Sequence, residues 1–576
     1  MYISNYRRRA DAVFLVFFLF LFFCLGRLLF IQFFRSNYLS RIAKKQHNLF
    51  MELEPRRGTI FDTNLKPQAI NIAMDSVYAC PSEIKDNLKN RIAAELASIL
   101  HINESALYQK LLRRKSFVWI ARKVPPEQSV AIKGLNFRGI GFIKETKRCY
   151  PNSYLASQLI GFAGLDNVGL EGIELAYNRY LKGEAGWGLF LRDARQRKLD
   201  LLERMVLPKD GDDVVLTIDE VIQYIAEREL DKAYKAFHAR GASIIVMNPH
   251  TGEILAMANR PTFDLDEYTK SEKESRRNRA ICDLFEPGSV FKIVTASAAL
   301  EEKRVNERDR FFCENGSYRV ANHILHDHEP LGWLTFKEVI EQSSNIGTTK
   351  VAQLLGPDIV YRYIKLFGFG DKTKIEIPGE ISGMVKEPKF WSKTSIGAVP
   401  IGQEVGVTAL QLVNALSVIA NGGQLMKPYM IKEIRDKFGE PIKKFSPTFV
   451  RKAISIETSA RMRAILAGVV EEGTGKLAKI PGYTCGGKTG TAQKIDPDGH
   501  YSHNKFFASF VGFAPADDPV IAIAVCVDEP HPYYYGGIVS APVFKNVATD
   551  VLRYLKIKQA SMGTQARSTR ETAPVD

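Results

Sequence analysis

The sequence predicts an α+β protein with an antiparallel sheet flanked by helices in its second half. A mixed α/β region precedes that sheet, and one membrane-spanning helix lies at the N-terminus. Three observations support this fold class. An apolar run follows an arginine cluster near the start, short strands joined by polar turns alternate with helices after residue 213, and 576 residues exceed one typical core.

The N-terminus predicts a membrane anchor. Arg7–Arg9 precede an almost uninterrupted apolar run over 12–34, which is long enough for a bilayer that needs about 20 residues. Arg27 lies toward the distal end, where its long side chain can reach the head groups. The arginines favour a cytoplasmic segment 1–9 and a helix 10–34, with the remainder outside. No A-x-A-like site follows the run, which argues against a cleaved signal peptide.

The rest of the chain divides at a polar turn, Lys209–Asp212. Residues 35–205 form a first region of short helices and strands without a catalytic constellation, and we expect 35–50 to continue the membrane helix. Residues 206–556 form a second domain. The last segment, 557–576, is polar and is expected to be a disordered tail.

The second domain carries the clearest secondary-structure signals. Asp219 is a plausible N-cap for a helix that reaches about Phe237. Apolar runs bounded by turns predict four strands. These are 241–247, 253–258, 506–513 and 520–527.

Composition and charge bear on the expected partners and on metal or disulfide sites. The net charge is +15, which suits an anionic membrane surface or polymer as well as a solvated basic surface. There is no zinc-finger spacing and no RNA-binding aromatic motif, so we expect no nucleic-acid partner. The seven cysteines are scattered without a C-x-x-C pair, so neither a zinc site nor a disulfide framework is indicated.

The strongest local feature is Ser289 followed by Lys292. The preceding Pro-Gly turn places Ser289 at the first turn of a helix, and positions three apart share a helix face. A serine hydroxyl needs a base to become nucleophilic, and a buried lysine with a lowered pKa can serve. Alone, S-x-x-K is weak, because a capping serine with a solvated lysine fits equally and Ser82 with Lys85 also matches.

Two further motifs strengthen this hypothesis. Ser343 and Asn345 form an S-x-N pair at the end of a helical run, although Ser502-His503-Asn504 matches too. Lys488–Thr491 follow in a strand context, and K-T-G occurs only there. The order S-x-x-K, S-x-N, K-T-G predicts acyl transfer with Ser289 as the nucleophile.

Two other patterns point to different chemistry. Residues 482–489 fit G-x-x-x-x-G-K-[ST], but that phosphate-binding loop needs a buried strand before it and a helix after it. His323, His326, Asp327 and His328 could be metal ligands. Their spacing lacks a helical i, i+4 pair, so a loop near the active-site cleft is the preferred interpretation, and no metal or cofactor is expected.

The three motifs, with further shared segments, resemble the class B penicillin-binding proteins, which are peptidoglycan D,D-transpeptidases. The resemblance covers about 10–556 and is closest to the septal, FtsI-type branch. One departure is Thr63-Asn64-Leu65 where the family usually reads Arg-Asn-Gly after the aspartate. The further shared segments are Pro55–Asp62, Tyr150–Ser153, Gly161–Gly164, Gly169–Glu174, Arg277–Ala280, Ile401–Gln403 and Thr408–Gln411.

The resemblance implies a role for each motif. Ser289 forms the acyl-enzyme with release of D-Ala, and Lys292 accepts its proton. Ser343 and Asn345 relay protons and orient the substrate. The segment Lys488, Thr489, Gly490 and Thr491 binds the substrate carboxylate, and the backbone N–H groups of Ser289 and Thr491 form the oxyanion hole. The first region would be a pedestal or dimerisation-type domain.

The resemblance also implies a setting in the bacterial cytoplasmic membrane, with one N-terminal helix and the catalytic domain outside. Expected partners are peptidoglycan stem peptides, β-lactams as inhibitors, a SEDS-type glycan polymerase and divisome proteins. The alternatives are an elongation- or sporulation-specific transpeptidase, a carboxypeptidase activity at the same serine, a β-lactamase or β-lactam sensor, and a binding protein without turnover.

Overall fold

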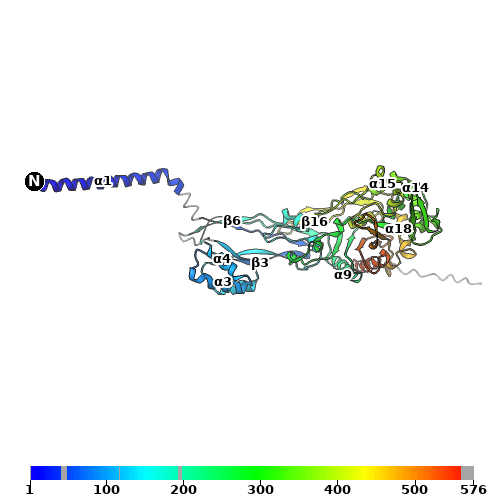
Figure 1. The fold of residues 1–576 in the computed structure, drawn as a ribbon, viewed down its shortest axis with the longest axis horizontal. Coiled ribbons are helices and arrows are strands. Elements are labelled where there is room, and N and C mark those ends of the chain that lie inside the picture. The colour runs from blue at the N-terminus through cyan, green and yellow to red at the C-terminus, as the bar shows by residue number, and fades with distance from the viewer. Residues whose placement is uncertain (1, 40–47, 114, 116, 193–197, 560–576) are drawn as a thin grey trace, which may run out of the picture. The chain divides into compact units, whose positions relative to one another are not determined.

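The computed structural model describes residues 2–39, 48–113, 115, 117–192 and 198–559 (Figure 1). The chain divides into two compact units, each assembled from separate segments. The first unit comprises Met1–Arg56, Ala73–Thr146 and Gly183–Asp210, and the second comprises Arg57–Ile72, Lys147–Lys182 and Gly211–Asp576. Of the predicted tail 557–576, residues 560–576 lie outside the described part.

The predicted membrane helix is present as α1 (Tyr2–Phe34). Its stretch Arg7–Phe34 is apolar and long enough to cross a membrane, and it is unburied in the structure. The expectation that residues 35–50 extend this helix is wrong at its end, because Asn48–Leu53 form strand β1. That strand pairs with residues 186–191, a long-range contact that local pattern does not reveal.

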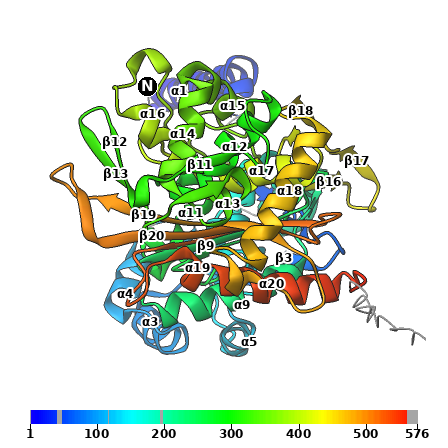
Figure 2. The same cartoon turned by 90° about the vertical axis from the view of Figure 1, so that its right-hand side faces the viewer.

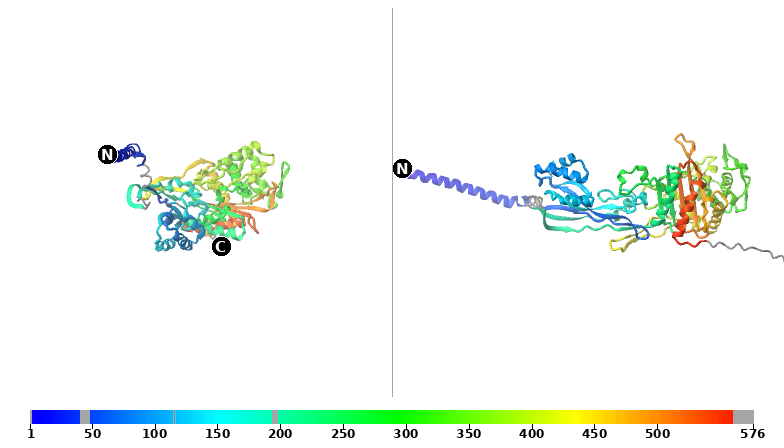
Figure 3. Two further views of the ribbon diagram at one scale, coloured as in Figure 1. Left: turned by 60° about the vertical axis from the view of Figure 1, so that its left-hand side comes forward. Right: turned by 90° about the horizontal axis from the view of Figure 1, so that it is seen from below.

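Within the first unit, β1 belongs to an antiparallel three-stranded sheet of order β1-β6-β7. Three helices pack on a second group of strands, as the blue part of Figure 3 shows. Their shared core combines apolar residues from α3, α4, α5, β3 and β4. The bounds are α3 Asp86–Leu100, α4 Glu104–Leu112, α5 Pro126–Gly134, β3 Pro67–Ala79, β4 Val118–Val124, β5 Ile140–Cys149, β6 Gly186–Arg192 and β7 Lys198–Val206.

The second unit contains the predicted antiparallel sheet, of strand order β10-β9-β21-β20-β19. The four strands expected from sequence are confirmed, and the K-T-G segment forms the fifth, at one edge. Asp219 caps α9 (Glu220–Ala236) by accepting from the backbone N–H groups of Val221 and Ile222. The strands are β9 Gly241–Met247, β10 Ile254–Arg260, β19 Gly486–Ile495, β20 Tyr501–Ala514 and β21 Ile521–Asp528.

Helices cover both faces of this sheet (Figure 2). Alternate residues of β21 enter different cores: Ile523 and Val525 pack with α9 and α20 (Ala541–Tyr554), whereas Ala524 and Cys526 pack with the helices of the other face. Period-two alternation of a strand explains this division. The other face is covered by α11 Arg279–Cys282, α17 Ala409–Ala420 and α18 Ile456–Glu471.

The remaining elements of the second unit connect these layers. Strands β2, β8, β16 and β17 belong to a further sheet, and β11 to β14 form short hairpin-like pairs. The strands are β2 Ile60–Phe61, β8 Asp213–Leu216, β11 Arg310–Phe312, β12 Ser317–Val320, β13 His323–His326, β14 Trp333–Thr335, β15 Gln424–Met426, β16 Ile431–Arg435, β17 Pro441–Lys444 and β18 Phe449–Lys452. The helices are α6 Ser157–Ile160, α7 Gly172–Ala176, α8 Asn178–Leu181, α10 Lys273–Arg276, α12 Lys292–Glu301, α13 Phe336–Glu341, α14 Asn345–Leu355, α15 Pro357–Leu366, α16 Ser395–Ala398 and α19 Gly536–Val539.

A buried ion network joins two sequence segments of the second unit. Glu174 is fully buried and binds the Nε atoms of Arg57 and Arg148, each at 2.6 Å. The Tyr150 hydroxyl donates to the same carboxylate at 3.3 Å. Charges out of water are tolerated only when paired and hydrogen-bonded. The network therefore explains why charged residues stand inside two glycine-rich turn segments.

Glu174→Gln should destabilise the second unit by about 3–5 kcal/mol, because it leaves two buried arginines without their counter-ion. The measurement is thermal unfolding of the full chain in detergent. Glu184→Gln is the control, since that carboxylate is exposed and only loosely paired with Lys209 at 3.5 Å. Equal melting temperatures for the two variants would contradict the role given to Glu174.

Candidate active site

Ser289 lies where a tight turn enters a buried helix. It belongs to a 3-10 turn, Gly288–Phe291, that runs directly into α12 (Lys292–Glu301). The predicted position at the first turn of a helix is confirmed, with 3-10 rather than α geometry at that turn. Gly288 has φ +53°, and a Cβ there would lie 2.8 Å from the carbonyl oxygen of Thr491. Only glycine permits this approach between the turn and β19.

Lys292 is fully buried at the start of α12. Its Nζ donates to the carbonyl oxygen of Ser343, to Asn345 Oδ1 at 2.7 Å and to Ser343 Oγ at 3.3 Å. Burial lowers its pKa from the ordinary lysine value to about 7, although Asp327 favours the charged form. The side chain is therefore poised to exist as a neutral amine near pH 7.

Ser343 lies in the turn between α13 (Phe336–Glu341) and α14 (Asn345–Leu355), and Asn345 is the first residue of α14. Ser343 has φ +62°, a left-handed conformation that is uncommon for a residue with a side chain. Ser344 between them caps α14 by accepting from the Gly347 N–H. The turn thus directs the Ser343 hydroxyl and the Asn345 amide toward Lys292.

Asp327 holds this turn in place, and sequence analysis did not assign it that role. Its carboxylate accepts from the Ser344 hydroxyl at 2.7 Å, from the Asn345 N–H, and from the Ile346 N–H at 3.1 Å. Asn345 Nδ2 also donates to the carbonyl oxygen of His326. In the sequence Asp327 stands only as part of a histidine-rich cluster that was expected to form a loop near the cleft. Its place beside the Ser343 turn agrees with the expected position, but His323 and His326 lie on strand β13, so the loop is limited to Asp327 and His328.

Lys488 is also fully buried, on the edge strand β19. Its Nζ donates to Ser343 Oγ at 2.8 Å, so that hydroxyl contacts both lysines. Burial and the nearby Lys292 lower the pKa of Lys488 well below its usual range. The first and last motifs, 199 positions apart in sequence, are thereby joined through the second.

The remaining residues of the K-T-G segment contact two parts of the chain: Gly490 packs against the nucleophile turn, and the two threonines bond to Thr474 and Gly536. A Cβ at Gly490 would lie 2.8 Å from the Pro287 carbonyl oxygen and 2.4 Å from Ser509 Oγ, so the strand contacts the nucleophile turn through bare backbone. Thr489 Oγ1 lies 2.8 Å from Thr474 Oγ1. Thr491 Oγ1 accepts from the Gly536 N–H at 3.0 Å.

Two of these supporting residues were missed from sequence. Thr474 follows α18 in a glycine-flanked turn whose backbone N–H donates to the carbonyl oxygen of Glu341. Gly536 begins α19, and a Cβ there would lie 2.2 Å from the carbonyl oxygens of Gly490 and Ser509. Glycine in a turn is a signal for close approach, but sequence does not say what it approaches.

The competing matches lie elsewhere. Ser82 and Lys85 are exposed residues before α3, with no hydrogen bond to each other. Ser502 bonds to Asn504 within β20. Lys488 and Thr489, the last residues of the phosphate-loop pattern, sit inside a strand with no helix after it, so that loop is not formed. Among the described residues no group of His, Cys, Asp and Glu is arranged to hold a metal.

Comparison with known proteins places this geometry in a family. The model described as the penicillin binding protein transpeptidase domain matches residues 242–549, and that of the penicillin-binding protein dimerisation domain matches residues 52–216. The chain belongs to the class B penicillin-binding proteins. It is a serine-type, penicillin-binding transpeptidase of this family.

Individual relatives align with most of this chain. Stage V sporulation protein D of Bacillus subtilis is 39% identical over 542 residues, 92% of this chain and 83% of that protein. Peptidoglycan D,D-transpeptidase FtsI of Escherichia coli is 31% identical over 550 residues, 94% and 91% of the two chains. Penicillin-binding protein 3 of Mycobacterium tuberculosis, crystallised with aztreonam, superposes with a TM-score of 0.70 at 27% identity, covering 88% of this chain and 98% of that one.

The lowered lysine pKa predicts the pH dependence of acylation. If neutral Lys292 is the base, labelled penicillin should react faster as the pH rises through about 7 and slowly below it, where the amine is protonated. Asp327→Asn should move this limb to lower pH, because it removes the charge that favours protonated Lys292. The measurement is the second-order acylation rate against pH. A rate that is flat through this range would exclude Lys292 as the base.

Proposed function

We propose that this class B protein is a peptidoglycan D,D-transpeptidase that cross-links stem peptides through an acyl-enzyme on Ser289. One observation carries the proposal: Lys292, Ser343, Asn345 and Lys488 form a continuous hydrogen-bonded set beside the turn that bears Ser289. These residues come from three distant segments and match the three motifs of the family. The names of relatives such as the Escherichia coli D,D-transpeptidase support the same reaction.

These contacts support the following first half-reaction. Ser289 Oγ attacks the carbonyl carbon of the penultimate D-Ala and passes its proton to neutral Lys292. The resulting oxyanion is held by the backbone N–H groups of Ser289 and Thr491. The C–N bond then breaks, and the leaving amine of D-Ala takes a proton relayed from Lys292 through Ser343. An ester on Ser289 remains.

The second half-reaction reverses the path with a different amine. An amino group of a neighbouring stem peptide attacks the Ser289 ester, gives its proton to the same relay, and forms the new amide as Ser289 is released. If water attacks instead, the product is a shortened peptide, which is the carboxypeptidase reaction. The same pocket therefore supports both outcomes, and exclusion of water decides between them.

The substrate carboxylate fits the hydroxyl side of β19. Thr489 and Thr491 offer hydroxyl donors on one face of the strand, while Gly490 between them packs its backbone against the nucleophile turn on the other face. Lys488 precedes both threonines on β19 and is fully buried, and its lowered pKa favours the neutral amine. The negative charge of an arriving substrate carboxylate would favour the protonated form of Lys488. Substrate binding should therefore be coupled to uptake of a proton by Lys488.

Replacing Ser289 with Ala should abolish covalent labelling by a fluorescent penicillin, because the adduct forms on the Ser289 hydroxyl, whereas the Ser343 hydroxyl that contacts both lysines serves as the proton relay. Ser82→Ala is the matched control, since it alters the other S-x-x-K serine and should label like wild type. Labelling is read on a denaturing gel, with the modified peptide identified by mass spectrometry. Full labelling of Ser289→Ala would overturn the assignment of the nucleophile.

We further propose that the enzyme acts at the division septum, anchored by α1 with its N-terminus in the cytoplasm and its catalytic domain outside. Residues 35–205 would form the pedestal and 206–556 the transpeptidase domain. A SEDS-type glycan polymerase and divisome proteins are the proposed partners. A sporulation role is the second candidate, favoured by the 39% identity to Stage V sporulation protein D.

Depletion of the protein separates these roles. A septal transpeptidase should give filamentous cells that grow without dividing, whereas loss of an elongation enzyme gives rounded cells. Cells that divide normally but fail to form heat-resistant spores would instead favour the sporulation role. If the depletion phenotype arises from loss of cross-linking, expression of the Ser289→Ala variant should not return the depleted cells to normal growth and division.

A further inference from the structure

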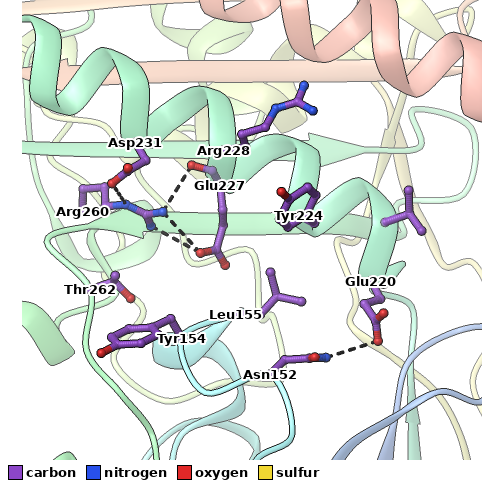
Figure 4. A pocket seen from close by; sticks show the side chains of 11 residues that line it. Asn152, Tyr154, Leu155, Glu220, Tyr224, Glu227, Arg228, Asp231, Arg260 and Thr262 are labelled. Carbon is purple, nitrogen blue, oxygen red and sulfur yellow. Dashed lines mark hydrogen bonds and ion pairs between the residues drawn. The ribbon is translucent and has the colours of Figure 1, made fainter.

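A pocket of about 660 Å³ lies in the second unit beside α9, apart from the residues of the acyl-transfer site. This volume is within the range of small-molecule sites, roughly 300–1,000 Å³. One wall is the segment Asn152–Leu155, which overlaps the end of the Tyr150–Ser153 motif that the catalytic mechanism leaves unexplained. The other wall is the outer face of α9, which carries Val221, Tyr224 and Arg228 (Figure 4).

Two tyrosines dominate the walls of this α9 pocket. Tyr154 is 54% exposed and Tyr224 is 58% exposed, and they come from opposite walls. Among the hydrogen bonds of the described residues, none uses either hydroxyl. Aromatic rings that are this exposed present an apolar face and a polar tip to a ligand.

The floor of the pocket is a buried ion pair. Arg260 donates to the Glu227 carboxylate and, at 3.2 Å, to Asp231. Glu227 also accepts from the Ala156 N–H at 2.7 Å, which ties the floor to the segment that carries Tyr154. Burial raises the pKa of Glu227, although Arg260 opposes the shift. Such a floor is rigid because breaking it would leave a buried charge unpaired.

Every charged residue that lines the pocket already has an oppositely charged partner in the chain. Glu220 faces Lys66 at 3.4 Å, Asp231 binds Lys235 at 2.7 Å, and Arg228 binds Asp550. Glu227 and Arg260 neutralise each other. The pocket therefore offers hydrogen-bonding groups and aromatic faces without an unpaired charge, which suits a neutral polar ligand better than a cation or an anion.

We propose that the α9 pocket binds an N-acetylated sugar of the peptidoglycan glycan strand. A pyranose ring has an apolar face that can stack on tyrosine, while its hydroxyl and acetamido groups can bond to the tyrosine hydroxyls, Asn152 and Thr262. The identity of the sugar rests on the proposed function, since that substrate class is a glycan-linked peptide. The pocket would hold a glycan strand without contacting the reacting peptide bond.

The test uses the full chain in detergent with Ser289 acylated by penicillin, so that the catalytic site is blocked. The probe is a neutral N-acetylglucosamine tetrasaccharide, followed by glycan strands stripped of stem peptides, and binding is measured by isothermal titration calorimetry. Saturable binding with a Kd at or below about 1 mM is expected. Tyr224→Ala and Tyr154→Ala should each weaken it about tenfold, because each removes one stacking surface.

Phe438→Ala is the control variant, because it removes an aromatic side chain that is 80% exposed but lies outside the pocket. Every variant should label with penicillin like wild type, which shows that it is folded. Absence of saturable binding, or binding that the two tyrosine variants leave unchanged, would overturn the sugar site while labelling stays intact. Loss of labelling at Ser289 in wild type would instead overturn the proposed function.

Discussion

The site depends on how the buried amine of Lys292 is held. A neutral lysine amine has two N–H donors and one lone pair. The Ser343 carbonyl oxygen and Asn345 Oδ1 lie within hydrogen-bond distance of Nζ and can accept both donors. The lone pair is then left for a proton from a serine hydroxyl. Burial makes the neutral form accessible near pH 7, and the two acceptors give it a direction.

This arrangement requires α12 and β19 to lie close enough to the α13–α14 turn for both lysines to hydrogen-bond to Ser343. Glycine residues at the contact points make this close packing possible. A side chain at Gly288 or Gly490 would collide with backbone atoms of the facing segment. The turn after α13 is kept in a left-handed conformation at Ser343 while Asp327 accepts from three groups of that turn. Rigid support of this kind holds catalytic groups at fixed distances before substrate arrives.

The strands and the individual motifs could be predicted because each is a short stretch of sequence, and the order of the motifs is read directly along the chain. Apolar runs bounded by turns identify β9 and β21, and Ser289 with Lys292 is visible as one helical turn. Asp327 and Thr474 could not be predicted, because their roles arise from contacts with Ser344 and Thr489, which lie 17 and 15 positions away. The same limit explains β1, whose pairing with residues 186–191 overrides the local expectation of helix.

The sheet order also bears on the α9 pocket. Arg260 ends β10 and Lys488 lies on β19, the two outer strands of the five-stranded sheet. Four strand spacings separate them, roughly 19 Å. A peptide of about five residues spans at most roughly 17 Å when fully extended. A sugar bound beside Arg260 would therefore lie at about the full reach of an extended stem peptide from the K-T-G strand, which favours a pocket that aligns the glycan strand over one that presents the reacting peptide.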